Sequence, residues 1–148
     1  MTETGPLARQ LMAIMGSRLL DPLEILLDDP VSDLRARCER AALRWADRLQ
    51  GPDANFAIAS IIGALYPGDS AFDPPADWWT TPLGQVVLQR MGFPGREAVT
   101  YAIAGAMLGV TRQGVHDLVT RHKLARHPDG GVTVTSIRER IQLRGKPV

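Results

Sequence analysis

The stretch TYAIAGAMLGVTRQGVHDLV, residues 100–119, decides the fold of the C-terminal part of this 148-residue chain. It predicts two short helices that meet at Gly109, because glycine takes the positive φ that ends a helix without a steric penalty. Thr100 and Thr111 stand directly before the two helical patterns, and we expect each to be an N-cap. Apolar residues at helical spacing give the second helix a buried side. A helix, a tight turn and a second helix together indicate a helix-turn-helix.

Small residues shape this pair of helices. Gly105 and Ala106 keep the first helix slim, which lets the second helix cross it closely. Gly114 lies inside the second helix, where glycine is about 1 kcal/mol less favourable than alanine. It would allow either a close approach of the backbone to a DNA duplex or close packing against the first helix. The sequence leaves both interpretations open.

The residues after the second helix predict a hairpin. Residues 124–135 form two short arms around the sequence PDGG at 128–131, a turn pattern with glycine where a positive φ is needed. The valines of the returning arm alternate with threonines, so one face of that strand is expected to be buried. Thr135 or Ser136 would then cap a last helix, whose arginines are expected to face outward: Arg138, Arg140 and Arg144.

The same region resembles the winged helix-turn-helix of the MerR-like and excisionase-type DNA-binding families. The resemblance rests on AMLGVTRQGVH, residues 106–116, and continues through Leu124 into RHPDGGVTV, residues 126–134, which looks like the wing. It covers roughly the last third of the chain and implies double-stranded DNA as the partner. MerR regulators carry this module at the N-terminus, before a dimerising helix and an effector domain. Here the module lies at the C-terminus, so an effector-sensing mechanism of that kind is not implied.

On DNA, the second helix would read base edges in the major groove from its first turns. Arg112 could bind guanine or a phosphate and Gln113 could bind adenine, and a good bidentate pair contributes roughly 1–3 kcal/mol of discrimination. Asp117 could instead orient Arg121 one turn further along the helix. The wing residues are expected to contact phosphates, which position a protein without specifying sequence. The candidate DNA-contacting residues are Thr111, Arg112, Gln113, His116, Arg121, Lys123, Arg126 and His127.

The charge distribution agrees with this interpretation. The chain has a net charge of +1. Up to Pro94 it contains eight basic and twelve acidic residues, a net charge of −4, and from Gly95 onward nine basic and four acidic residues, a net charge of +5. The positive charge therefore accompanies the helix-turn-helix, as a phosphate-binding surface requires. A solvated basic face is the alternative explanation.

The rest of the chain predicts an all-helical N-terminal domain over residues 1–68, a linker over residues 69–81 and a winged domain over residues 82–148. In the first domain the pairs Asp21-Pro22 and Asp29-Pro30 are expected to open helices, and Asp53 is expected to cap a third. The linker contains Trp78-Trp79, which would either form an exposed platform for a partner or fill the seam between the domains. The fold class is therefore mainly α, with a small two-stranded wing.

Several functions are not expected. The single Cys38 excludes an internal disulfide, and the start of the chain lacks the features of a signal peptide, so we expect a cytoplasmic protein. His116, His122 and His127 share no face that could hold a metal ion. No Gly-rich phosphate loop, nucleophile motif or paired carboxylate pattern is present, so we expect neither an enzyme nor a cofactor.

The leading hypothesis is a DNA-binding transcriptional regulator that forms a homodimer through its N-terminal helices. An excisionase-like architectural factor fits the same sequence features. A protein-interaction adaptor with a winged helix that does not bind DNA is the alternative from another class. Such an adaptor should lack base-reading polar groups on the second helix, whereas Arg112, Gln113 and His116 provide them.

Overall fold

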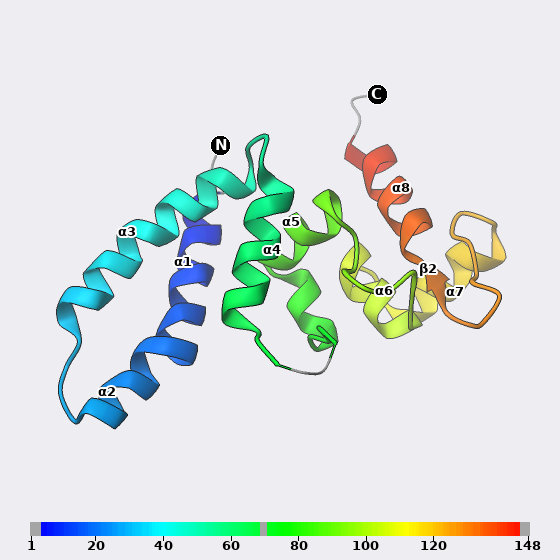
Figure 1. Cartoon of the computed structure of the whole chain (residues 1–148). Helices are drawn as coiled ribbons and strands as arrows, with labels where there is room; N and C mark the ends of the chain where they lie inside the picture. The colour runs from blue at the N-terminus through cyan, green and yellow to red at the C-terminus, as the bar shows by residue number, and fades with distance from the viewer. Residues whose placement is uncertain (1–3, 69–70, 146–148) are drawn as a thin grey trace. The chain divides into compact units, whose positions relative to one another are not determined.

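The computed structural model describes residues 4–68 and 71–145 of the chain. The protein is mainly helical and has a small two-stranded antiparallel sheet, which confirms the predicted fold class. It divides into two compact units, residues 1–69 and residues 70–148, which we describe separately (Figure 1). No helix within the described residues is both long and apolar enough to cross a membrane.

The first unit begins with one nearly continuous helical segment. It consists of α1 (Thr4–Met15), the π-helix η1 (Gly16–Leu20) and α2 (Asp21–Leu27). The prediction that Asp21 caps a new helix is wrong, because its backbone is helical (φ −63°, ψ −47°) and its carboxylate binds Arg35 instead. The wider π turn directly precedes Pro22, whose ring would clash with the carbonyl four residues earlier in a regular α-helix.

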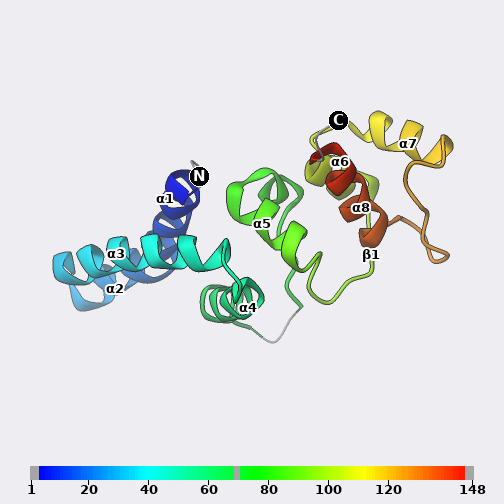
Figure 2. The ribbon, with the colours of Figure 1, turned by 90° about the horizontal axis from the view of Figure 1, so that it is seen from above.

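Two more helices complete the first unit: α3 (Ser32–Leu49), which lies beside α1, and α4 (Ala54–Leu65), which follows it (Figures 1 and 2). They differ from the expectation at two points. The helix expected at Asp29-Pro30 starts only at Ser32. Asp53 occupies the N-cap position of α4 as expected, but its carboxylate makes no capping bond and accepts hydrogen bonds from Arg48 instead. The core of this unit includes Leu7, Leu11, Ala42, Ala46, Leu49 and Ile58.

The second unit begins in the stretch that the sequence suggested was a linker. Residues 76–80 form the 3₁₀-helix η2 (Ala76–Thr80), and Trp78 and Trp79 are buried. Their rings meet edge to face with centroids 4.9 Å apart, and Phe93 lies 4.9 Å from Trp79. The tryptophans are therefore core residues of the second unit, which contradicts both the exposed platform and the linker. Burial of two tryptophan rings removes a large aromatic area from water, which favours their place in the core. The prolines Pro74 and Pro75 directly before η2 made this stretch resemble a linker.

Helix α5 (Pro82–Arg90) follows and is capped by Thr81, whose hydroxyl accepts a 3.1 Å hydrogen bond from the Gly84 amide. Helix α6 (Tyr101–Leu108) lies at the centre of the unit and packs against η2, α5, α7 (Arg112–Thr120) and α8 (Val134–Gly145). The Thr100 hydroxyl accepts a 3.2 Å hydrogen bond from the Ile103 amide, so the predicted cap of α6 is confirmed.

The small sheet pairs strands from distant parts of the sequence. Strand β1 (Ala98–Val99) runs antiparallel to β2 (Val132–Thr133), and Val99 faces Val132. The predicted hairpin is present at the turn, and both valines of its returning arm are buried as expected. Its outgoing arm, however, makes only an isolated bridge at Arg126, so the second strand of the sheet is β1 and not the outgoing arm.

The last helix differs from the expectation at its start and on its outer side. It begins at Val134, and its cap is Thr133 and not the expected Thr135 or Ser136: the hydroxyl of Thr133 accepts a 3.3 Å hydrogen bond from the Ser136 amide. Two of its arginines reach other helices. Arg138 donates to the carbonyl of Gln89 in α5 at 3.0 Å, and Arg144 donates to the carbonyl of Leu108 in α6 at 2.9 Å.

Candidate nucleic-acid interface

Helix α7 and its N-cap residue Thr111 provide the first four candidate DNA-contacting residues, and the turn before the helix fixes its position. Gly109 has φ of +75°, as predicted, and the Val110 amide donates a 2.9 Å hydrogen bond to the carbonyl of Gly105. The Thr111 hydroxyl accepts a 2.9 Å hydrogen bond from the Gly114 amide, which confirms the second predicted N-cap. The capping bond therefore already engages the hydroxyl that could have reached a phosphate.

The two small glycines of this region have different neighbours. A Cβ atom on Gly105 would lie 2.7 Å from the carbonyl oxygen of Val110, so only glycine permits this close approach of α6 to the turn. A Cβ atom on Gly114 would lie 3.3 Å from the Cβ of Val110. Gly114 is half-buried and faces the turn, which favours the packing interpretation over close approach to a duplex.

The outward side of α7 is polar. Val115 is fully buried, whereas Arg112, Gln113, His116 and Asp117 are exposed. Gln113 Nε2 donates a 3.2 Å hydrogen bond to Asp117 Oδ1, one turn away on the same face. This contact replaces the expected pairing of Asp117 with Arg121, which is not among the ion pairs of the described residues. The amide of Gln113 is consequently oriented along the helix.

A surface pocket of about 340 Å³ connects the start of α7 to the tip of the wing. Its lining includes two arginines, Arg96 and Arg112, with Tyr101 and the glycines of the hairpin turn. The complete lining is Arg96, Ala98, Val99, Thr100, Tyr101, Arg112, Gly130 and Gly131. Two positive charges beside a hydroxyl-bearing residue form a suitable surface for a phosphate group.

Sequence reasoning missed Arg96 and Tyr101. Arg96 is held by an ion pair of 3.4 Å with Asp73 and lies over the ring of Phe93, 5.2 Å from its centroid. The ring of Tyr101 lies 6.1 Å from that of His116, centroid to centroid. Arg96 lies before the helix-turn-helix pattern of residues 100–119, and Tyr101 lies within it at a position with no predicted role. The only available signal was that Arg96 opens the basic part of the chain, since the pairing of β1 with β2 cannot be read from local sequence.

The wing turn is ordered by His127. Its amide donates a 3.0 Å hydrogen bond to the carbonyl of Gly131, and its carbonyl accepts one of 2.9 Å from Gly130. The Nδ1 atom of its ring accepts a 3.1 Å hydrogen bond from the Asp129 amide. His127 is half-buried, so its first role is to shape the turn. Only its other ring nitrogen, Nε2, is left for a ligand.

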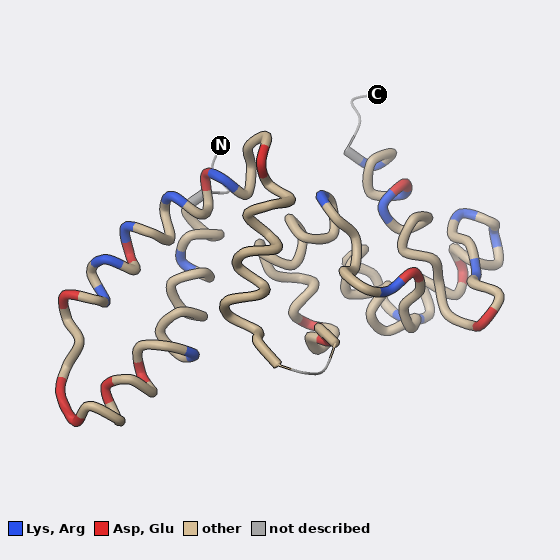
Figure 3. The backbone as a smooth tube through the Cα atoms, viewed as in Figure 1, with Lys and Arg blue, Asp and Glu red and all other residues tan. Residues whose placement is uncertain are grey.

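The remaining candidates lie between α7 and the wing. Arg121, Lys123 and Arg126 are all exposed, and none forms an ion pair with another described residue. In Figure 3 the basic positions of this segment cluster between the end of α7 and the hairpin, interrupted by few acids. These side chains are therefore available to a polyanion, and their charge is not neutralised within the described chain.

The three histidines lie on three different segments of the second unit. His116 lies on the outer side of α7, His122 follows the helix with φ of +61°, and His127 lies in the wing turn. No group of three potential metal ligands occurs within the described residues.

No protein-family model matches the chain, and no curated protein or solved structure matches it either.

Proposed function

We propose that the second unit is a winged helix-turn-helix that binds double-stranded DNA, and that the protein acts as a transcriptional regulator. Helix α7 would enter the major groove, with Arg112, Gln113 and His116 toward the base edges. Arg96, Arg121, Lys123 and Arg126 would contact phosphates on either side. Such a role would place the protein in the cytoplasm, at the nucleoid in a bacterium.

One structural arrangement supports DNA binding over the alternative functions. A helix with an exposed polar outer side is positioned by a rigid capped turn, and it lies beside a pocket lined by two arginines and the wing turn. An adaptor that used this face for protein docking would be expected to expose apolar residues there. On the outer side of α7, Arg112, Gln113, His116 and Asp117 are all polar.

We further propose that the protein binds DNA as a homodimer through its first unit. A two-fold dimer would contact two half-sites about one helical turn apart. A regulator that occupies its site and an architectural factor that bends DNA would both use this arrangement, and measurement of DNA bending in the complex would distinguish them.

Fluorescence anisotropy with mixed genomic duplex tests the proposal. The chain is titrated at two salt concentrations beside the variant Arg112→Ala/Gln113→Ala and a control, Arg9→Ala, which removes an exposed arginine of the first unit. We expect salt-sensitive binding by the wild type and the control, with a slope of log K against log salt near −0.9 for each phosphate contacted. The double variant should lose most of this binding. A folded wild-type protein that fails to bind at low salt would exclude the DNA-binding function.

A further inference from the structure

Helix α2 exposes a set of large apolar side chains. None of its residues is buried, and Ile25, Leu26 and Leu27 are 78%, 81% and 58% exposed. Leu19, just before the helix, is also exposed. We call these four residues the α2 ridge. Burial of a leucine or isoleucine side chain contributes roughly 1.5–3 kcal/mol, and contiguous exposed apolar surface commonly marks an interaction site.

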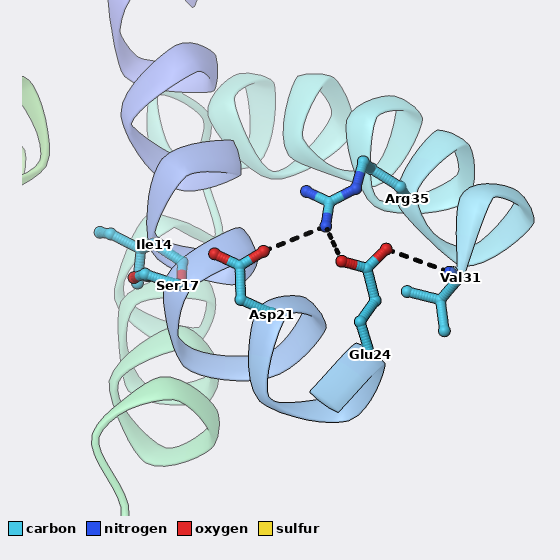
Figure 4. A network of polar contacts seen from close by, with 6 residues as sticks. All are labelled: Ile14, Ser17, Asp21, Glu24, Val31 and Arg35. Carbon is cyan, nitrogen blue, oxygen red and sulfur yellow. Dashed lines mark hydrogen bonds and ion pairs between the residues drawn. The ribbon is translucent and has the colours of Figure 1, made fainter. Parts of the chain in front are cut away.

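The ridge is held in a fixed conformation. Arg35 Nη2 on α3 binds Asp21 Oδ1 at 3.1 Å and Glu24 Oε1 at 3.2 Å, while Glu24 Oε2 accepts a 3.1 Å hydrogen bond from the Val31 amide (Figure 4). The hydrogen bond to Asp21 is the main cause that raises the pKa of Arg35 above its ordinary value. Because α2 is anchored on its polar side, its apolar side chains are presented as a preorganised surface, which reduces the entropy lost on binding.

Charges of both signs flank the ridge. The turn between α2 and α3 carries the exposed acids Asp28 and Asp29, and the first turn of α3 carries the exposed Asp33; we call these three residues the acidic tip. The outer face of α3 carries the exposed arginines Arg37, Arg40 and Arg44, spaced three and four residues apart on one side of the helix, which we call the arginine stripe. Figure 3 shows the acids at the tip and the arginines along α3, where the exposed acids Glu39 and Asp47 also lie. None of the six residues of the acidic tip and the arginine stripe forms an ion pair with another described residue.

We infer that a second copy of this chain covers the α2 ridge in a two-fold dimer, with the acidic tip of each copy against the arginine stripe of its partner. A two-fold interface uses the same patch on both copies, so the patch must complement itself. A surface for an acidic or a basic partner would carry one sign of charge. Here the apolar ridge, the acidic tip and the arginine stripe lie on successive elements of the same unit, so one patch carries both signs of charge and can complement itself.

This inference deepens the proposed dimeric DNA-binding function and rests on it for its biological purpose. Association is nevertheless measured without DNA, so the two can fail separately. A dimer that does not bind DNA would contradict only the proposed function, and a monomer that binds a single half-site would contradict only the dimer.

The first experiment measures the mass of the full chain by sedimentation velocity over a range of concentrations. We compare the wild type with Ile25→Ser/Leu26→Ser and with a control, Leu143→Ser, which alters a leucine of α8 that is 61% exposed. The wild type and the control should form dimers. The dissociation constant of the ridge variant's dimer should be at least about a hundredfold higher, since two apolar side chains per copy are lost from the interface. Circular dichroism confirms that all three are folded.

The second experiment exchanges the charges. One variant reverses the tip (Asp28→Arg/Asp29→Arg) and the other reverses the stripe (Arg40→Glu/Arg44→Glu). Each alone would place like charges together and should be monomeric. Mixed together, they should form a heterodimer, because both tip-to-stripe contacts are then of opposite sign.

Three results would contradict the inference, the first two in whole and the third in its charge arrangement. A wild type that stays monomeric at every concentration would mean that something other than a second copy covers the ridge. A ridge variant that dimerises like the wild type would place the interface elsewhere. If the ridge variant dissociates but the mixed charge variants remain monomeric, the proposed tip-to-stripe arrangement is wrong.

Discussion

The guanidinium of Arg144 donates a 2.9 Å hydrogen bond to the carbonyl oxygen of Leu108, the last residue of α6. The final carbonyls of a helix have no partner within it, and a positive charge there also interacts favourably with the helix dipole. Arg138 does the same near the end of α5 through the carbonyl of Gln89. Helix α8 therefore fastens the ends of two other helices, including the one that precedes the proposed recognition helix.

Replacement of Arg144 should destabilise the second unit without altering its outward face. Arg144→Ala is expected to lower the free energy of unfolding by about 1 kcal/mol, since one charge-assisted hydrogen bond is lost at a partly exposed site. Urea denaturation followed by circular dichroism measures this change. Gln142→Ala, two residues away and exposed on the same helix, is the control and should change stability little. Equal stability of the two variants would refute a capping role for Arg144.

Two glycines inside helices should respond to alanine with opposite signs. Gly105→Ala is expected to lower the free energy of unfolding by about 1–2 kcal/mol, because the new Cβ would lie 2.7 Å from the carbonyl oxygen of Val110. Gly63→Ala in α4 meets nothing within 4 Å and should stabilise by about 0.5–1 kcal/mol through helix propensity. Thermal unfolding of both variants checks the pair. A stabilised Gly105→Ala variant would show that α6 and the turn are not in close contact.

The pocket between α7 and the wing gives Arg96 a measurable role under the proposed function. Arg96→Gln should reduce the slope of log K against log salt by about 0.9, the change expected for one phosphate contact. Its effect should be similar on every DNA sequence, whereas Gln113→Ala should weaken binding mainly on the preferred sequence. Anisotropy titrations at several salt concentrations distinguish the two patterns. An unchanged slope for Arg96→Gln would exclude it from phosphate contact.

Local signals in the sequence predicted the two N-caps, the turn between α6 and α7 and the buried valines well. Thr100 and Thr111 are N-caps, Gly109 has a positive φ, and the valines of the returning arm are buried, as predicted. Each of these features depends on residues within three or four positions of one another. The geometry of this part of the proposed site was therefore accessible from sequence.

Features that depend on distant residues could not be predicted. The pairing of β1 with β2 joins positions about 35 residues apart, and it alone brings Arg96 to the wing. The cap signal at Asp21 was overridden because Arg35, 14 residues later, binds its carboxylate. Trp78 and Trp79 lacked helical periodicity, and only the aromatic cluster with Phe93 explains their burial. In each case a tertiary contact replaced a local preference.

Alanine substitutions at two adjacent glycines of the wing separate the effect of its contact with β1 from the effect of backbone strain. Gly130 and Gly131 both have positive φ, +109° and +82°, so alanine at either position should destabilise by about 1–2 kcal/mol through backbone strain. Only at Gly131 would the Cβ also meet another strand, 2.5 Å from the carbonyl oxygen of Val99, whereas at Gly130 it would meet nothing within 4 Å. Gly131→Ala should therefore lower the free energy of unfolding by about 1 kcal/mol or more beyond Gly130→Ala. Urea denaturation of the two variants measures the difference, and equal losses would mean that the wing does not pack on β1.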